Sequence, residues 1–336
     1  MTFPKRIKMN RAALVLGSYL LVPLGAVRGE GTNDHWVDTS PHKGALAAAN
    51  RIHLHYLNWG GAGETMLFLA GLGDSAHIFD NIAPEFTNQF HVLALTRRGF
   101  GKSDHPKAGY ELKSLTDDIA QFLDALNIMR VILVGHSFGG TEVTVFARRF
   151  PTRVGKLVYL DAAYDYTAAG TDLLSEVDAL EAHPSDAERK NYSALHDWFA
   201  RNRPGWNDAC EADFRDTRSP SSKSWSFSTT PGEIMELLEK EVFSFKPDFT
   251  KITVPALAFF ADHNFNKLLA SATQASRTND VAVLTRAQKW QADQIDRFRH
   301  DVRNSKVVML ADTDHFCFIQ RQQEVVRSMR TFLKGE

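Results

Sequence analysis

The sequence predicts an α/β fold, with a mostly parallel central sheet flanked by helices. Short apolar stretches typical of buried strands alternate along the chain with stretches that repeat apolar residues at helical spacing. One apolar strand runs directly into a serine flanked by glycines, and a helix-like stretch follows. The alternation fails only over residues 164–249, which are helical in pattern. Strands joined in this way by helices are expected to pair in parallel through right-handed crossovers.

Composition narrows the class of protein. The chain has 336 residues, of which 43% are hydrophobic and 24% charged, which is ordinary for one large domain or a domain with an insert. The formal net charge of −1 gives no indication of a nucleic-acid partner. Neither a zinc-type Cys/His spacing nor a glycine-rich phosphate loop occurs. The sequence therefore implies no metal and no organic cofactor, and it leaves the oligomeric state open.

Residues 1–29 differ in character from the rest of the chain. Lys5, Arg6, Lys8 and Arg11 precede a short apolar run that glycine and proline interrupt. A basic segment followed by a short apolar one predicts a secretory signal peptide, and the run is too short and interrupted for a comfortable membrane span. An uncleaved N-terminal anchor is the alternative. We therefore expect an exported protein, periplasmic or secreted.

The first elements follow in regular order. Residues 51–59 alternate between apolar and polar side chains, as a half-buried strand does. Residues 65–69 (TMLFL) form a buried strand that delivers the glycine-rich segment 70–73 to the edge of the sheet, and residues 91–95 form the next strand. Apolar residues spaced along one face between residues 115 and 126 predict a helix.

The centre of the pattern is a serine on a tight turn. Residues 131–134 (VILV) have the composition of a buried strand, residues 135–139 (GHSFG) are a G-x-S-x-G sequence, and apolar residues at helical spacing follow. A nucleophile on such a strained turn needs glycine two positions before and after it, because the neighbouring backbones pass very close. The helix behind Ser137 also offers its free N–H groups to a developing oxyanion.

This strand, turn and helix resemble the nucleophile elbow of the α/β-hydrolase fold superfamily, and the resemblance extends from about residue 51 to the C-terminus, apart from the central insert. It implies that Ser137 is a nucleophile. The superfamily usually carries His-Gly-x after the strand that here ends at residue 69, and the backbone N–H of x forms the oxyanion hole with the N–H after the nucleophile. Carried over, these donors are Leu72 and Phe138. Ala70 replaces the usual histidine, but the donor is backbone.

The second half continues the same pattern after an interruption. Residues 156–161 (KLVYLD) are the next strand, and residues 164–249 occupy the place where the superfamily carries a helical cap. Three regions are therefore expected after the N-terminal segment: core residues 30–163, a helical cap at 164–249 inserted before the penultimate core strand, and core residues 250–336. The remaining elements are a strand at 254–260, a helix at about 280–301, a last strand at 307–310 and a closing helix at 323–333.

The remaining catalytic groups are a histidine and an acid. His315 lies on the loop after the last strand, where the superfamily keeps its general base. The acid usually follows the preceding strand in a pattern like P-x-L-x-x-x-G-x-x-D, but from Pro255 that pattern ends on Asn264, whose amide cannot stabilise an imidazolium ion as a carboxylate does. One branch of the superfamily instead carries its acid one strand earlier, where Asp161 stands. We favour Asp161, with Asp262 as the alternative.

These residues predict a serine hydrolase of carboxylesterase type. Ser137 would attack the carbonyl of a carboxylic ester of a small or apolar substrate, and water would release the acid from the acyl-enzyme. Amide or iminopeptide hydrolysis, C–C bond hydrolysis and cofactor-free haloperoxidase activity use the same scaffold and remain alternatives, as does a non-catalytic ligand-binding protein. Cys210 and Cys317 are the only cysteines; a disulfide and two buried free thiols are both open.

Overall fold

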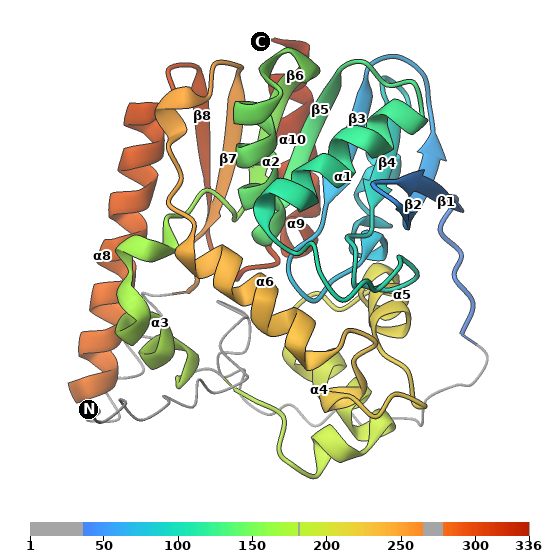
Figure 1. Ribbon diagram of the computed structural model, residues 1–336. Helices are drawn as coiled ribbons and strands as arrows, with labels where there is room; N and C mark the ends of the chain where they lie inside the picture. The colour runs from blue at the N-terminus through green and yellow to red at the C-terminus, as the bar shows by residue number, and fades with distance from the viewer. Residues whose placement is uncertain (1–35, 181, 265–277, 336) are drawn as a thin grey trace, which may run out of the picture.

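The computed structural model describes residues 36–180, 182–264 and 278–335 (Figure 1). The predicted signal peptide or anchor at residues 1–29 lies outside them. Among the residues described, no helix combines the length and the apolar character that crossing a bilayer requires.

The core is a single eight-stranded sheet with the order β1-β2-β4-β3-β5-β6-β7-β8. Every neighbouring pair from β4 to β8 is parallel, whereas β2 is antiparallel to both β1 and β4. The mostly parallel α/β sheet predicted from the sequence is therefore confirmed. The strands are β1 (Lys43–Ala49), β2 (Ile52–Gly60), β3 (Thr65–Leu69), β4 (His91–Leu95), β5 (Val131–His136), β6 (Val154–Leu160), β7 (Ala256–Ala261) and β8 (Ser305–Leu310).

The edge strand β1 is an addition that the sequence does not predict. It pairs along its whole length with β2, from Lys43 opposite Asn58 to Ala49 opposite Ile52. Its sequence, KGALAAA, is small and its first four residues are exposed, so the alternation that marks a half-buried strand is weak. Pairing with β2, rather than its own side chains, makes this segment a strand.

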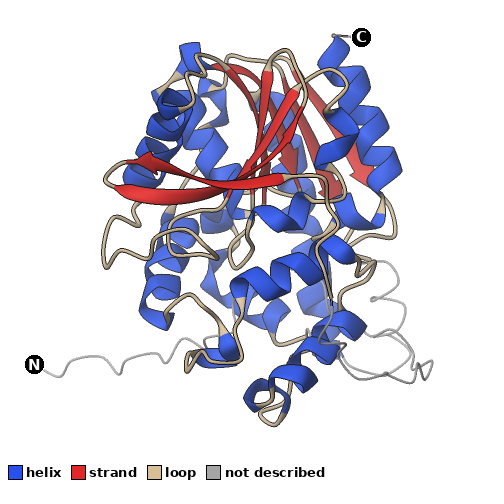
Figure 2. Ribbon diagram, turned by 90° about the vertical axis from the view of Figure 1, so that its right-hand side faces the viewer, coloured by secondary structure: helices blue, strands red, loops and turns tan. Residues whose placement is uncertain are grey.

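Helices cover both faces of the sheet (Figure 2). Alternate residues of each central strand point to opposite faces, as Val131 and Ile132 do in β5. One face packs against α1 (Leu112–Ala125), α2 (Phe138–Arg149) and α8 (Thr278–Asp301). The other packs against the short 3-10 helices η1 (Ala76–Phe79) and η2 (Ala83–Phe86), together with α9 (Cys317–Gln320) and α10 (Gln322–Lys334). The alternating strands and helices thus bury a continuous layer on each side.

The segment between β6 and β7 is helical, as expected, and its described residues add no strand to the sheet. In Figure 1 its helices lie below the sheet, beneath the ends of the central strands. The assignment of residues 164–249 as a separate cap domain stays a prediction. The helices are α3 (Gly170–Asp178), α4 (Tyr192–Asn202), α5 (Asp208–Thr217) and α6 (Gly232–Ser244).

Candidate active site

Ser137 occupies a strained turn between β5 and α2. Its backbone has φ 52° and ψ −120°, a conformation that residues with a side chain rarely adopt. A Cβ atom added to Gly135 would lie 2.5 Å from the carbonyl carbon of Gly139, and one added to Gly139 would collide with the carbonyl oxygen of Leu69. Both glycines of the G-x-S-x-G sequence are therefore required by close backbone contacts, as expected for this turn.

His315 and Asp161 meet although 154 residues separate them in the chain. Asp161 directly follows β6, and His315 lies on the loop after β8. The imidazole Nδ1 of His315 is 2.8 Å from Oδ2 of Asp161, whose side chain is fully buried. Asp161 also has a positive φ of 47°, so strained backbone occurs at this residue as well as at Ser137. The residue pair favoured from the sequence thus has the geometry of a carboxylate that orients an imidazole.

Three further donors surround the carboxylate of Asp161. Its Oδ1 accepts hydrogen bonds from the Tyr164 hydroxyl at 2.5 Å and the Ala261 amide at 3.0 Å, while the His263 Nε2 atom lies 3.2 Å from Oδ2. Burial alone raises the pKa of this carboxyl, but the imidazoles of His263 and His315 outweigh it and hold the pKa well below its usual range. Asp161 therefore stays ionised. The sequence does not predict the role of His263.

Asp262, the alternative acid, contacts backbone amides, whereas Asp161 contacts an imidazole. Its carboxylate accepts hydrogen bonds from the backbone amides of Asn264 at 3.0 Å, Asp312 at 3.0 Å and Thr313 at 3.2 Å. These contacts tie the end of β7 to the loop that carries His315. Asp262 is therefore placed to shape that loop, while Asp161 contacts the imidazole itself.

The two expected oxyanion donors belong to segments that meet at Ser137. Leu72 lines the same cavity as Ser137, and a Cβ added to the preceding Gly71 would be 3.2 Å from the Cβ of Ser137. Phe138 is the first residue of α2, where helical N–H groups have no partner within the helix. The structure thus brings the segment of Leu72 against the turn that contains Ser137 and Phe138.

A buried arginine, Arg97, connects that segment to α2. Its guanidinium donates to the carbonyl oxygens of Ala70 at 2.7 Å and Gly71 at 3.1 Å, and it binds both carboxylate oxygens of Glu142 in α2 at 2.7 and 2.5 Å. It also lies over the ring of Phe138, 4.6 Å from the ring centroid. The sequence does not predict these contacts, because they join segments that are far apart in the chain.

His136, next to the serine, is a second buried imidazole. Its Nε2 donates to the backbone carbonyl of His315 at 3.0 Å, and the centroids of the two rings lie 4.6 Å apart. Burial, followed by the neighbouring His315, holds the pKa of His136 well below its usual value, so the ring is neutral. His136 therefore supports the loop of His315.

The cavity beside these residues has a volume of about 190 Å³. The core contributes Leu72, Ser137 and His315 to its wall, and the helical insert closes it from the other side. Its apolar part includes aromatic rings, and its polar part contains guanidinium and carboxylate groups. The aromatic residues are Trp198, Phe199 and Phe316; the charged ones include Arg189, Arg203, Arg218, Asp74, Glu236 and Glu239.

The two cysteines are buried and are not joined in a disulfide. Burial, followed by the charges of Asp161 and Asp314, raises the pKa of the Cys317 thiol well above its usual value. The thiolate is the nucleophilic form of cysteine, so this thiol is inert despite its closeness in sequence to His315.

Comparisons with known proteins agree with this architecture. Residues 64–221 match the model of a family described as alpha/beta hydrolase fold. The chain is 28% identical over 251 residues to 2-(acetamidomethylene)succinate hydrolase of Mesorhizobium japonicum, which covers 66% of this chain and 89% of that protein. It is 32% identical over 162 residues to 2-hydroxy-6-oxo-2,4-heptadienoate hydrolase of Pseudomonas putida, covering 47% of this chain and 55% of that protein.

The solved structure of E-2-(acetamidomethylene)succinate hydrolase superposes with a TM-score of 0.66 at 22% identity, over 87% of this chain and 99% of that one. At that identity the likeness concerns the fold. Together with the family match and the eight-stranded sheet, it shows that the chain has the α/β-hydrolase fold.

Proposed function

We propose that this protein is a serine hydrolase that cleaves a carboxylic ester through an acyl-enzyme on Ser137. The observation that carries the proposal is the 2.8 Å contact of His315 Nδ1 with Asp161 Oδ2, at a cavity that Ser137 also lines. With Nδ1 donating to the carboxylate, Nε2 of His315 keeps its lone pair and can accept the proton of the serine hydroxyl. A non-catalytic ligand-binding protein would not require an imidazole held in this tautomer.

The reaction has two halves. Ser137 Oγ attacks the ester carbonyl while His315 takes its proton, and the negative charge on the carbonyl oxygen is stabilised by the N–H groups of Leu72 and Phe138. The C–O bond then breaks, and the imidazolium returns the proton to the departing alkoxide. Water, deprotonated by His315, attacks the acyl-enzyme and releases the carboxylic acid and free Ser137. Asp161 stabilises the imidazolium in both halves.

The residues of the cavity wall suit a substrate that has an apolar part and a carboxylate. Phe199 and Phe316 offer aromatic faces, and the guanidinium of Arg203 lies 4.0 Å from the ring centroid of Phe316. Arg189 and Arg218 bring two more cations to the same wall. Guanidinium groups bind carboxylates through paired hydrogen bonds, which would orient such a substrate.

Amide hydrolysis is a second candidate. The relative from Mesorhizobium japonicum, which this chain matches over 89% of its length, is named for an acetamido compound derived from succinate. Such a substrate combines an amide bond with carboxylates, and the arginines of the cavity would suit it. The same Ser137, His315 and Asp161 would act on it, with the amine as leaving group.

We also propose that residues 1–29 direct export of the protein.

The test is a matched set of substrates. Esters and amides of one short acyl group are prepared with and without a carboxylate on the leaving group, and hydrolysis is measured for the parent protein and for Ser137→Ala. We expect the esters to be cleaved faster, the carboxylate to lower KM, and Ser137→Ala to lose ~10⁴-fold or more in kcat. A parent that cleaves only the amides would replace the ester proposal with the second candidate. Activity of Ser137→Ala within about tenfold of the parent would refute both.

A further inference from the structure

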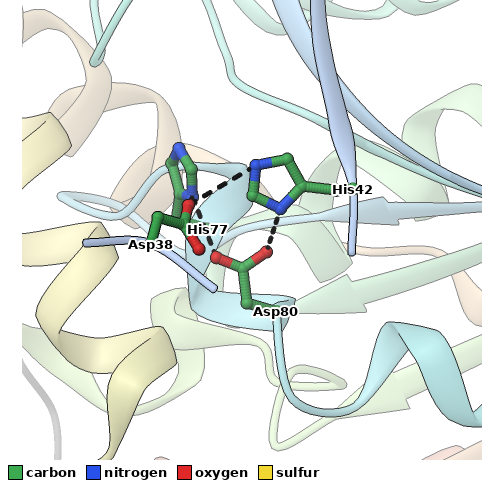
Figure 3. Close-up of side chains that lie close together, drawn as sticks. All are labelled: Asp38, His42, His77 and Asp80. Carbon is green, nitrogen blue, oxygen red and sulfur yellow. Dashed lines mark hydrogen bonds and ion pairs between the residues drawn. The ribbon is translucent and has the colours of Figure 1, made fainter. Parts of the chain in front are cut away.

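Four metal-binding side chains meet outside the catalytic cavity. Asp38 and His42 lie in the segment that leads into β1, while His77 and Asp80 belong to η1 and its C-terminal end. Figure 3 shows the two imidazoles and two carboxylates turned toward one another from these two segments. One ring nitrogen or carboxylate oxygen from each residue lies within 4.8 Å of the other three.

The distances suit a small ion. His77 Nδ1 lies 2.9 Å from Asp80 Oδ2 and 3.5 Å from Asp38 Oδ2, and His42 Nδ1 lies 2.9 Å from Asp80 Oδ1. Four ligands at ~2.0–2.1 Å from a tetrahedral zinc ion are separated from one another by about 3.3 Å. These contacts use both oxygens of Asp80, and one ligand atom from each residue lies within 4.8 Å of the other three, so side-chain rotations that draw the four atoms together would complete the tetrahedron.

Two of the contacting atoms have only each other as partners. His42 Nδ1 and Asp80 Oδ1 are both buried and lie 2.9 Å apart as an ion pair, and neither has any other hydrogen-bond partner among the described residues. The side chain of Asp80 is only 3% exposed, which makes an unsatisfied carboxylate oxygen costly. Atoms that converge on a shared ion have this arrangement, because their lone pairs point to the ion rather than to each other.

We propose that Asp38, His42, His77 and Asp80 form a structural binding site for a divalent transition-metal ion of the zinc type. Two imidazoles and two carboxylates are ligands that Zn²⁺ accepts, and the two carboxylates neutralise its charge. A full set of four protein ligands leaves no position for substrate, which is typical of structural rather than catalytic zinc. The ligand spacings resemble no zinc motif in the sequence, because the two pairs come from separate segments.

An ion at this site would connect two segments of the chain. It joins the segment before the edge strand β1 to η1, and Ser75, the N-cap of η1, directly follows the cavity-lining segment at 71–74. Ser75 is itself held by the buried Asp213 of α5, which accepts its backbone N–H at 2.6 Å. An ion bound at one end of η1 would therefore stabilise the folded state at the edge of the sheet, without contacting the reacting atoms.

The experiment uses the full-length protein without a histidine tag, freed of metal with a chelator and titrated with Zn²⁺ by calorimetry. We expect one equivalent to bind and to raise Tm, and tetrahedral Co²⁺ absorption bands to appear when Co²⁺ replaces Zn²⁺. His77→Ala should weaken Zn²⁺ binding by more than ~100-fold, beyond the ~10–100-fold typical for residues that only support a ligand. His42→Gln, at a more exposed ligand, should weaken it as well.

His53→Ala is the matched control, since His53 forms an exposed pair with Asp104 at 3.2 Å and should leave binding unchanged. If the parent binds no Zn²⁺, the four residues are two metal-free His–Asp pairs and the proposal is wrong. Binding that survives in both His77→Ala and His42→Gln would place the ion elsewhere and refute it equally. The parent titration decides the matter even if one variant fails to fold.

Discussion

Replacing Asp161 by asparagine tests how the carboxylate controls His315. The oxygen that receives the backbone N–H of Ala261 must remain an acceptor, because an amide N–H cannot change its role. In Asp161→Asn the side-chain oxygen therefore takes the Oδ1 position. The new NH₂ group takes the Oδ2 position, which is 2.8 Å from His315 Nδ1. Two N–H donors would then face each other. His315 would have to present a lone pair at Nδ1 and carry its proton on Nε2. In that tautomer Nε2 cannot accept the proton of Ser137.

The size of the loss follows from this argument. When the acid of a serine protease triad is replaced by its amide, the wrong tautomer with intact geometry costs ~10⁴-fold in kcat, or about 5.5 kcal/mol of transition-state stabilisation. Asp161 additionally faces His263 through the same oxygen, at 3.2 Å, so the substituted amide meets two imidazoles. We therefore expect a loss in kcat of ~10⁴-fold with little change in KM, since Asp161 is fully buried and does not line the cavity.

The assay is ester hydrolysis over a range of substrate concentrations, with circular dichroism to check the fold. Asp262→Asn is the matched control: its remaining oxygen keeps the amides of Asn264 and Thr313, and only the contact with Asp312 is lost. We expect that variant to keep kcat within about tenfold of the parent, because no contact to His315 changes. A folded Asp161→Asn protein with near-parent kcat, combined with a large loss in Asp262→Asn, would refute the assignment of the acid.

Three further predictions follow from the same contacts. Arg97→Lys removes the paired hydrogen bonds to Glu142 and one contact to the Leu72 segment. We expect kcat to fall by ~10-fold or more, but by no more than the ~10²–10³-fold that the loss of a whole oxyanion donor costs. An unchanged kcat would mean that Arg97 does not position Leu72. Glu239 lines the cavity, and burial followed by Glu236 raises its pKa to about 7. Its carboxyl is neutral below that pH and negative above it, so KM for a carboxylate-bearing ester should rise as the pH passes about 7, and Glu239→Gln should abolish the rise; the same pH profile in both proteins would contradict this. Limited proteolysis should cut first within residues 164–249, where Asp186, for example, is 89% exposed, and a first cut within residues 36–163 would argue against a cap.

Local patterns made much of the fold predictable. The G-x-S-x-G turn can be predicted from the sequence because the residues that it requires lie within five consecutive positions. The close backbone contacts at Gly135 and Gly139 explain why glycine is required there. The buried strands are readable because their side chains are apolar on both faces. The edge strand β1 is not readable, since its small exposed residues become a strand only by pairing with β2.

The candidate site is predictable in its principal residues but not in its supporting ones. Asp161 is a candidate from sequence because it ends a strand at the catalytic edge, and Asn264 excludes the usual acid position. The contacts of His263 with Asp161 and of Arg97 with Ala70 connect segments whose proximity depends on the order of strands in the sheet. The Asp38–His42 and His77–Asp80 pairs are separated in the same way. Side-chain meetings of this kind carry no signal in the local sequence.

Activation of Ser137 by His315 is the step on which the proposed hydrolysis depends. The most direct measurement is reaction of the full-length protein with a fluorophosphonate, which phosphonylates activated serines, followed by digestion and mass spectrometry of the labelled peptide. We predict a single adduct on Ser137, present in the parent, absent in Ser137→Ala and slowed ~10⁴-fold in Asp161→Asn, as the tautomer argument requires. A folded parent protein that stays unlabelled, or an adduct on another residue that persists in Ser137→Ala, would contradict this mechanism.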